Sequence, residues 1–466
     1  MLKVLSCRVY EVHQLYEVHQ LYEVHQLYEV PQLYEVPQLY VIHQSHVRAV
    51  EEDWCTSYTL HPASRRTARS APRFVLQHFT AAVVSFGPGR PAIPLLSECV
   101  MQTPPLGSSK LDLDTPNLCI DLDAFEANVR EVMDTCRRHG VAWRPHAKCH
   151  KSPDIAHRLL DAGAIGMTCA KLGEAEIFAA AGIPDLLIAN LVVGPQKMRR
   201  LVELRRQADP IVCLDHLEQA EPISQAMVEA GQKVRAILEI DIGLQRVGVA
   251  PGEPALRLAQ QVSRLPGIEL AGIMGYEGHL LLIQDAAEKE AKIRAGLAIL
   301  TTTQKMLEDH DIRCGIVSCG GTGSFELCVS QPGISEIQSG GAIFMDAFYR
   351  HKCNIKQFQY ALTVLSTVVS RPAPDRAIID AGRKTMNMEI CLPLVLGRED
   401  IRVVSLSAEH GVLKLDPSAQ SLRIGDRLEL IPGYGDLTTV LHDRFFAFRG
   451  AKLEDIWPLA ARGRLQ

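Results

Sequence analysis

The chain has 466 residues, of which 47% are hydrophobic and 22% are charged, a balance typical of a globular protein with a large core. Its formal net charge of −5 and its pI near 6.4 leave no broad basic surface, so the composition argues against nucleic-acid binding. The sequence has no apolar run of roughly eighteen residues and does not begin with a signal-peptide pattern, so we expect no membrane segment and a cytoplasmic location.

The first hundred residues differ in composition from the rest of the chain. A six-residue unit, LYEVHQ changing to LYEVPQ, repeats from Leu15 to Gln38, and residues 57–100 contain five arginines against one acidic residue, Glu98. The repeat matches no known solenoid pattern, and the prolines in its last copies disfavour a strand. We interpret residues 1–100 as a low-complexity, disordered extension and place the start of the folded part near Met101.

From Met101 onward the sequence predicts alternating helices and strands. Leu122, Phe125 and Val129 recur at helical spacing, and the helix they predict ends near Gly140. Eight short apolar runs follow as predicted strands, at residues 141–144, 166–170, 185–190, 210–215, 234–241, 269–276, 314–321 and 335–341. This alternation predicts an α/β fold with a (β/α)8, TIM-like barrel, whose site lies at the carboxyl ends of the strands.

Beyond Tyr360 the pattern changes to strands such as YALTVLSTVVS and RAIIDAG, with turn residues between them. This change predicts two domains, a barrel over residues 101–359 and a C-terminal β domain over residues 360–466. The first strand after Met101 could also join the C-terminal domain. Thirteen cysteines, scattered without any C-x-x-C pair, are typical of reduced core thiols rather than of a disulfide framework or a structural zinc site.

A basic stretch, RPHAKCHK at residues 144–151, follows the first predicted barrel strand. A lysine must lose its proton before it attacks a carbonyl, and nearby positive charge together with partial burial lowers its pKa. Considered alone, such a cluster is more often a solvated loop. Its place at the mouth of a barrel favours a reactive lysine.

A glycine-rich stretch, SCGGTGS at residues 318–324, ends the seventh predicted strand. Glycines let backbone amides approach an anion, and Thr322 and Ser324 add hydroxyl donors, so this turn could hold a phosphate without any lysine. The alternative is an ordinary glycine turn. The end of strand seven, however, is where barrel enzymes commonly bind phosphate.

Several motifs occur together between about residues 111 and 460: LDTPNLCIDLDAFEANV, RPHAKCHKS, CAKLGEAEIFAAAGI, SCGGTGS, EIQSGGAIFMDAFY and LSAEHG. In this combination the chain resembles the D-threonine aldolase and eukaryotic-type D-serine dehydratase group, relatives of alanine racemase with the fold-type III architecture. The resemblance implies pyridoxal 5′-phosphate as cofactor and a small D-amino acid as substrate. It also implies a homodimer with sites near the interface.

The resemblance also implies roles for individual residues. Lys148, the first lysine of RPHAK, would bind the cofactor covalently, and Lys151 would begin a helix. The 318–323 turn would hold the phosphate, and Gln338 would face the pyridine nitrogen, where a neutral amide makes the cofactor a moderate electron sink. The full set of implied cofactor-binding residues is Lys148, His146, Arg246, Tyr276, Ser318, Gly321, Thr322, Gly323, Gln338 and Tyr349.

Further roles within this pocket follow from the same resemblance. Arg246 would face the phenolic oxygen of the cofactor, and Tyr276 would stack on its ring. Glu277 and His279 would line the mouth of the pocket as an acid, a base or a polar wall. We include His279 among the candidate catalytic residues.

The group's metal-binding motif, His-x-Asp or His-x-Cys, is changed in this chain to Tyr434-x-Asp436. A neutral phenol is a poor ligand, but one carboxylate with water can still hold Mg²⁺ or Mn²⁺ weakly. Asp436 is therefore a candidate metal ligand, which His442 could assist. Alternatively, the phenol of Tyr434 acts as a catalytic acid or base in a metal-independent variant.

This pattern favours a carbon–carbon lyase that cleaves D-threonine-like substrates to glycine and an aldehyde, because Asp436 rather than cysteine is present at the second position of the motif. Deaminating dehydration of D-serine and racemisation of an amino acid are alternative reactions. A pyridoxal-phosphate-binding regulator without turnover is a third alternative, which the predicted C-terminal β domain disfavours.

Overall fold

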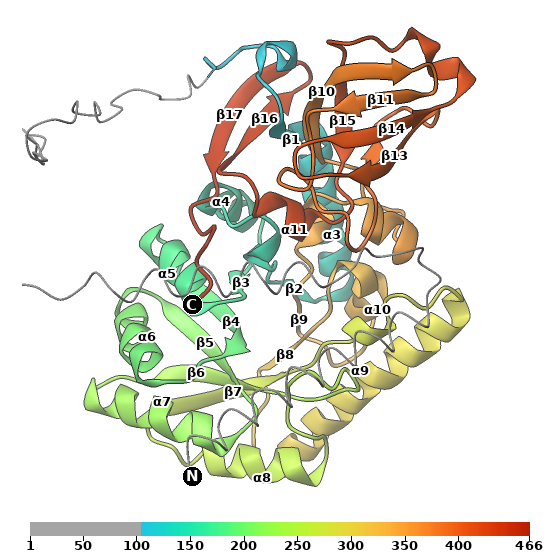
Figure 1. The fold of residues 1–466 in the computed structure, drawn as a ribbon. Helices are drawn as coiled ribbons and strands as arrows, with labels where there is room; N and C mark the ends of the chain where they lie inside the picture. The colour runs from blue at the N-terminus through green and yellow to red at the C-terminus, as the bar shows by residue number, and fades with distance from the viewer. Residues whose placement is uncertain (1–103) are drawn as a thin grey trace, which may run out of the picture. The chain divides into compact units, whose positions relative to one another are not determined.

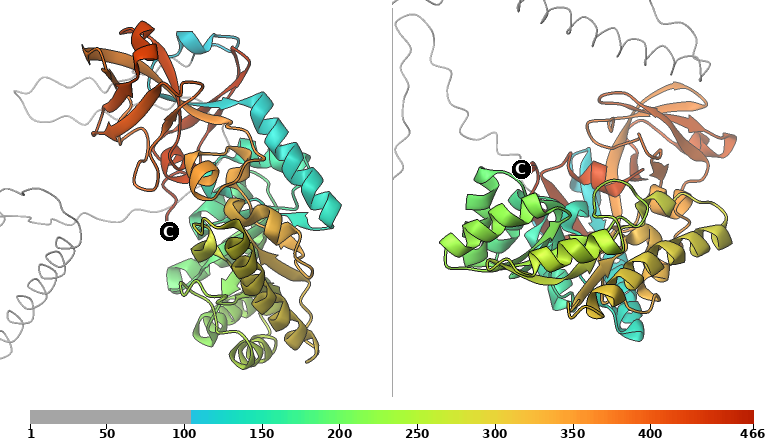
Figure 2. Two further views of the ribbon diagram at one scale, coloured as in Figure 1. Left: turned by 90° about the vertical axis from the view of Figure 1, so that its right-hand side faces the viewer. Right: turned by 90° about the horizontal axis from the view of Figure 1, so that it is seen from below.

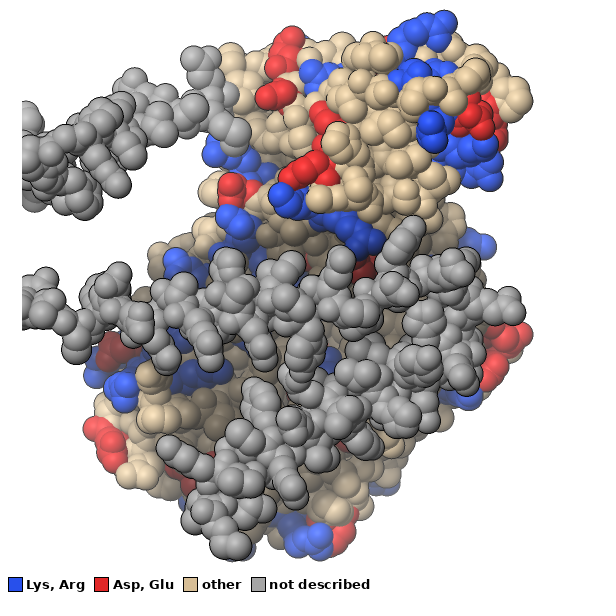
Figure 3. All heavy atoms as spheres, in the orientation of Figure 1, with Lys and Arg blue, Asp and Glu red and all other residues tan. Residues whose placement is uncertain are grey.

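The computed structural model describes residues 104–466, which form one compact unit of the chain (Figure 1). The predicted low-complexity extension, residues 1–100, lies outside the described residues. Within the described part, no helix combines the length and the apolar character needed to cross a membrane. On the part of the face that Figure 3 leaves uncovered by grey atoms, Lys and Arg side chains are interspersed with Asp and Glu.

A parallel sheet of eight strands forms the barrel (Figure 1). Its order is β2-β9-β8-β7-β6-β5-β4-β3, and a parallel bridge between His146 and Thr168 joins the two end strands. The strands are β2 (Ala142–Trp143), β3 (Met167–Cys169), β4 (Asp185–Leu191), β5 (Asp209–Leu214), β6 (Val234–Glu239), β7 (Ile268–Met274), β8 (Ile316–Cys319) and β9 (Glu336–Ile337). All eight predicted strands are present, and the predicted fold class is confirmed.

Helices cover the outside of this sheet (Figure 2). They are α3 (Leu122–His139), α4 (Pro153–Asp161), α5 (Leu172–Ala180), α6 (Pro195–Gln207), α7 (Leu217–Glu229), α8 (Glu253–Val262), α9 (Ala286–Glu308) and α10 (Phe325–Val329). The predicted first helix is confirmed. It begins where the Asp121 carboxylate accepts a hydrogen bond from the Ala124 amide, and it ends at Gly140, whose φ of 67° requires glycine's freedom in the left-handed region.

A second sheet has nine strands in the order β11-β14-β13-β12-β15-β10-β1-β16-β17. They are β1 (Asn117–Asp121), β10 (Leu362–Ala373), β11 (Arg376–Ile379), β12 (Leu394–Val395), β13 (Ile401–Leu406), β14 (Gly411–Leu415), β15 (Arg427–Ile431), β16 (Arg444–Arg449) and β17 (Lys452–Pro458). All pairs are antiparallel except β1 with β16. Although β1 precedes the barrel in the sequence, it lies in this second sheet, between β10 and β16.

A short helix, α11 (Gly435–Thr439), connects the second sheet to the mouth of the barrel (Figure 1). It packs against the 3₁₀ turn η3 (Ala147–Cys149), which follows β2. Two backbone hydrogen bonds fix the approach to α11, from the Ala347 amide to the Pro432 carbonyl at 3.1 Å and from the Phe348 amide to the Gly433 carbonyl at 3.0 Å. The second sheet therefore contributes residues to the open end of the barrel.

The cysteines behave as the sequence predicts. Ten cysteines lie in the described residues, all of them unpaired, and only Cys391 is not fully buried. Burial raises the pKa of the Cys136 thiol to about 12, so this side chain stays neutral and acts as a small apolar group.

One buried ion pair links the first and last strands of the barrel. Arg144 donates from Nε to Glu336 Oε1 at 3.0 Å and from Nη1 to Asp185 Oδ1 at 2.8 Å, and only 2% of its side chain is exposed. We predict that Glu336→Gln destabilises the fold by roughly 3–5 kcal/mol, because it removes a negative charge that pairs with the buried Arg144 guanidinium. Urea unfolding followed by circular dichroism measures the change.

The matched control is Glu203→Gln, which removes an exposed pair with Arg206. We expect it to cost less than about 1 kcal/mol, because solvent screens exposed charges. Equal stability losses in the two variants would show that the Arg144 pair does not contribute as described.

Candidate active site

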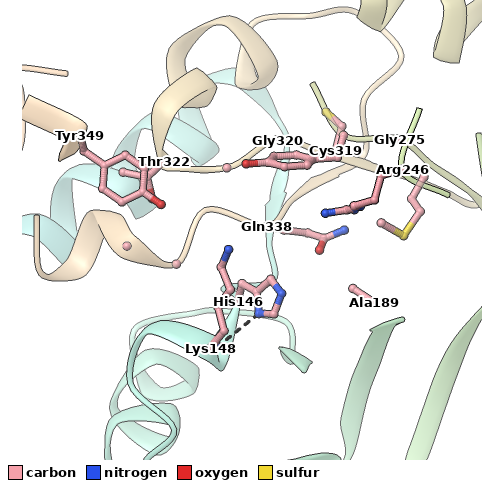
Figure 4. A pocket seen from close by; sticks show the side chains of 15 residues that line it. His146, Lys148, Ala189, Arg246, Gly275, Cys319, Gly320, Thr322, Gln338 and Tyr349 are labelled. Atoms are coloured by element: carbon pink, nitrogen blue, oxygen red, sulfur yellow. Dashed lines mark hydrogen bonds between the residues drawn. The ribbon is translucent and has the colours of Figure 1, made fainter. Parts of the chain in front are cut away.

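A pocket with a cavity volume of about 90 Å³ opens at the carboxyl ends of the barrel strands (Figure 4). Eight of the residues predicted from the sequence line it: His146, Lys148, Arg246, Tyr276, Gly321, Thr322, Gln338 and Tyr349. The structure adds seven further lining residues: Ala189, Met274, Gly275, Cys319, Gly320, Gly340 and Gly341. Cys319 and Gly320 belong to the glycine-rich stretch that the sequence indicated, whereas most of the others are small residues whose chemistry alone gave no signal.

Lys148 extends from η3 into the pocket (Figure 4), and its Nζ lies 3.3 Å from Asp436 Oδ2. The expectation that neighbouring positive charge lowers the pKa of Lys148 is wrong for the free protein. The Asp436 carboxylate raises this pKa, and burial opposes it only in part. A carboxylate from α11, which the sequence could not place beside the lysine, dominates its environment.

Lys151 does not line the pocket. Its ammonium donates a hydrogen bond to the buried Glu174 at the start of α5, and the residue precedes Ser152, the N-cap of α4. The two lysines of the basic stretch therefore have different environments. Lys148 is the one that lines the pocket.

Two glycine turns, at Gly320–Gly321 and at Gly340–Gly341, line the pocket. A Cβ at Gly340 would lie 2.2 Å from the His146 carbonyl oxygen, and a Cβ at Gly341 would lie 2.6 Å from Tyr349 Cε2. On the other turn, Gly320 has φ +79°, and Thr322 Oγ1 lies 3.2 Å from Ser339 Oγ. The close packing that glycine permits at these turns, with the Thr322 hydroxyl beside them, fits a phosphate-bearing aldehyde next to an amine.

Gln338 is held at the floor of the pocket. Its Nε2 donates to the buried Ser318 Oγ at 2.9 Å. Ser318 therefore supports Gln338 from behind and does not line the pocket. Gly323 also lies outside the lining, next to Leu281.

Arg246 and Tyr276 lie next to each other in the pocket lining, and the Tyr276 ring lies against Gly321. The guanidinium carbon of Arg246 lies 5.5 Å from the centre of the Tyr276 ring, and its Nη2 lies 3.3 Å from Glu239 Oε1. Burial raises the pKa of Tyr276 to about 12, so its phenol remains neutral. A neutral ring beside a cation is a suitable wall for a planar anionic cofactor.

The two polar residues that follow Tyr276 are placed differently from the prediction. Glu277 is completely buried and accepts hydrogen bonds from Ser324 and Cys328, so it does not line the pocket mouth. The imidazole of His279 packs against Gly243 and also lies outside the pocket lining. The structure therefore does not bring either residue into the site, because the chain turns away from the pocket at Glu277.

Tyr434 and Asp436 reach the site from the second sheet. The Tyr434 hydroxyl donates to Asp436 Oδ2 at 2.9 Å, the same oxygen that pairs with Lys148. Burial raises the pKa of Tyr434 above its ordinary value. The three side chains form one connected group, of which Lys148 lines the pocket, whereas Tyr434 and Asp436 are not among its lining residues.

Sequence reasoning missed Asp346, which positions this group. Its Oδ1 accepts from the Tyr349 amide at 2.9 Å, and its Oδ2 accepts from the Gly435 amide at 2.8 Å. Burial raises the pKa of Asp346 to about 7. The only available signal was an acidic residue within the otherwise apolar stretch AIFMDAFY.

The donor set around Asp436 does not fit a divalent metal. One carboxylate oxygen already accepts from Tyr434 and pairs with Lys148. His442 does not assist, because its Nε2 lies 2.9 Å from the Thr385 carbonyl oxygen. Among the described residues, only Glu277, Cys319 and Cys328 cluster closely enough to offer three metal-binding groups, and that cluster does not include Asp436.

We predict that Gly341→Ala weakens cofactor binding by roughly 10- to 100-fold, because the new methyl group would have to displace the Tyr349 ring at a cost of about 1–3 kcal/mol. Titration of the apoprotein with pyridoxal phosphate, followed by absorbance, measures this affinity. Gly315→Ala is the control, because its nearest neighbour would be 3.6 Å away. Unchanged affinity in Gly341→Ala would contradict the assignment of these glycine turns to cofactor binding.

Three comparisons place these features among known proteins. The alanine racemase N-terminal domain family matches residues 120–347, and the putative serine dehydratase domain family matches residues 361–448. A D-threonine aldolase from Arthrobacter sp. is 40% identical over 353 residues, covering 75% of this chain and 93% of that protein. A 3-hydroxy-D-aspartate aldolase from Paracoccus denitrificans is 34% identical over 368 residues, covering 77% of this chain and 94% of that protein.

The crystal structure of D-threonine aldolase from Filomicrobium marinum superposes with a TM-score of 0.76 at 36% identity, covering 78% of this chain and 99% of that one. The likeness thus extends over both sheets and nearly the full length of the relatives. The chain belongs to the D-threonine aldolase family of fold-type III, pyridoxal-phosphate-dependent lyases.

Proposed function

We propose that this chain cleaves the Cα–Cβ bond of D-configured β-hydroxy amino acids of the threonine type, giving glycine and an aldehyde. The observation that supports this most directly is that the Lys148 amine lines the same pocket as the glycine turns and lies 3.3 Å from Asp436, which accepts a hydrogen bond from Tyr434. This places an amine for the cofactor beside groups that can accept a proton from a substrate hydroxyl.

Pyridoxal phosphate, when bound, supplies an electron sink for the pair of electrons released when a bond to Cα breaks. Lys148 would hold its aldehyde carbon, and Thr322, Gly321 and Tyr349 would contact its phosphate. Gln338, fixed by Ser318, would face the ring nitrogen as a neutral partner. Arg246 and Tyr276 would line the ring, and His146 the floor beside Lys148.

The proposal includes a homodimer, a cytoplasmic location, and a boundary between barrel and β domain near residue 360. We infer the homodimer from the resemblance of the motifs and the cytoplasmic location from the composition. We infer the domain boundary from the change of pattern beyond Tyr360. The break in secondary structure between η7 (Phe348–Lys352) and β10 supports this boundary.

The test is to incubate the purified chain and pyridoxal phosphate with D-threonine, D-3-hydroxyaspartate and D-serine, and to identify the products. We expect acetaldehyde and glycine from D-threonine, and no turnover of L-threonine. Lys148→Ala should lower kcat by at least about a thousandfold, because it removes the amine that holds the cofactor. A keto acid with ammonia would instead indicate dehydration, and the opposite enantiomer would indicate racemisation.

A separate prediction concerns which lysine binds the cofactor. Borohydride reduction of the holoenzyme should fix the pyridoxyl group on Lys148 and leave Lys151 unmodified, because Lys151 is engaged by Glu174 outside the pocket. Peptide mass spectrometry distinguishes the two sites. Label on Lys151 would overturn the assignment of the cofactor lysine.

A further inference from the structure

We infer that the hydrogen-bonded pair of Tyr434 and Asp436 does the work of a divalent metal ion, and that this chain cleaves its substrate without one. The inference rests on the proposed aldol cleavage and deepens it. Its basis is that the Asp436 carboxylate already pairs with the Lys148 ammonium and accepts a hydrogen bond from the Tyr434 hydroxyl.

The carboxylate has little capacity left for an ion. Its Oδ2 accepts from the Tyr434 hydroxyl at 2.9 Å and lies 3.3 Å from Lys148 Nζ, and only 9% of the Asp436 side chain is exposed. In the free protein, a divalent cation at Oδ2 would have to displace this hydrogen bond and compete with the Lys148 ammonium for the same oxygen. Tight binding would also need a second protein ligand, and the neutral phenol is a poor one.

The phenol is fixed rather than free to swing away. Its ring packs edge-on against Phe348 at 5.3 Å and Tyr349 at 6.0 Å between centroids. The Tyr434 carbonyl accepts from Thr438 Oγ1 at 3.0 Å, and the next amide, that of Gly435, is held by Asp346. Because Tyr349 lines the pocket, Tyr434 is held next to a residue of the pocket lining.

This arrangement can complete the reaction without a metal. The substrate's Cβ hydroxyl gives its proton to the Tyr434 oxygen, and the Tyr434 proton passes to the Asp436 carboxylate. As the Cα–Cβ bond breaks, the oxygen's electron pair forms the aldehyde C=O bond, and the pair from the broken bond stays on Cα, where a bound cofactor would stabilise it. Cα then takes a proton from the Lys148 ammonium and becomes glycine. The protonated Asp436, whose Oδ2 lies 3.3 Å from Lys148 Nζ, returns a proton to Lys148, so the net result is that one proton has moved from oxygen to carbon.

The first experiment removes metal from the enzyme. The purified chain is dialysed against a chelator, its metal content is checked by elemental analysis, and cleavage of D-threonine is measured with and without added Mn²⁺. We expect rates that agree within about twofold, because acid–base transfer through side chains needs no Lewis acid. Loss of activity with the metal and recovery on adding Mn²⁺ would overturn the inference.

The second experiment restores a metal ligand with Tyr434→His. An imidazole beside the Asp436 carboxylate makes a two-ligand site, so we expect Mn²⁺ affinity to rise at least about tenfold over wild type and cleavage to become chelator-sensitive. Electron paramagnetic resonance of bound Mn²⁺ measures affinity independently of turnover. Equal affinity in both proteins, or tight wild-type binding that Asp436→Asn abolishes, would overturn the inference.

Tyr434→Phe tests the hydroxyl alone, because the ring can still pack on Phe348 and Tyr349. We expect kcat to fall by roughly 10²- to 10⁴-fold, with unchanged KM, cofactor absorbance and melting temperature. Tyr360→Phe is the matched control, since that tyrosine lies beside Arg350 and His351 and does not line the pocket. Equal rates in the two variants would overturn the role of the Tyr434 hydroxyl.

These readouts separate the inference from the proposed function. If no β-hydroxy amino acid is cleaved with or without metal, the aldolase proposal fails, and the inference as a statement about catalysis fails with it. If cleavage occurs only with metal, the aldolase proposal stands and the inference alone fails. Mn²⁺ affinities of wild type and Tyr434→His then show whether the residue at this position controls metal binding.

Discussion

The contact between the Lys148 amine and the Asp436 carboxylate joins the two sheets of the molecule at the pocket. Lys148 lies on η3 after the first barrel strand, and Asp436 lies on α11, between strands β15 and β16 of the second sheet. Neither sheet by itself contains both groups. Asp346 stabilises the contact by accepting amide hydrogen bonds from both Tyr349 and Gly435, so the position of α11 determines the charge environment of the reactive lysine.

The pocket also depends on the absence of side chains. Gly340 lies against the His146 backbone and Gly341 against the Tyr349 ring, so a Cβ at either position would occupy space that the chain already fills. Close approach of these turns leaves room and backbone polar groups for an anion, and Arg246 and Tyr276 also line the pocket, with the Tyr276 ring against Gly321. Close packing therefore requires glycine at positions 340 and 341. Beside Lys148, by contrast, the chemistry requires charged and phenolic groups.

Sequence patterns predicted the fold well because they report local periodicity. Apolar runs of strand length, separated by amphipathic segments, identified all eight barrel strands, and helical spacing with Gly140 identified the limits of α3. The same reasoning failed for groups whose surroundings come from distant segments. Glu277 turned out to be buried behind the glycine turn, and the pKa of Lys148 is raised rather than lowered, since Asp436 lies 288 positions later in the chain.

The sequence by itself determined the class of fold, the identity of the reactive lysine as a candidate, and the replacement of a histidine by Tyr434 in the family's motif. Only the tertiary structure decided which polar groups lie together. It places Asp436 and Tyr434 beside Lys148, and it places the Ser318 hydroxyl where Gln338 donates a hydrogen bond to it. It leaves His279 outside the pocket lining. The physical reason is that periodicity and motif order depend on neighbours in the chain. The electrostatic environment of a residue and the geometry of a ligand site depend instead on neighbours in space. Loops and the packing of the domains determine which residues become such neighbours.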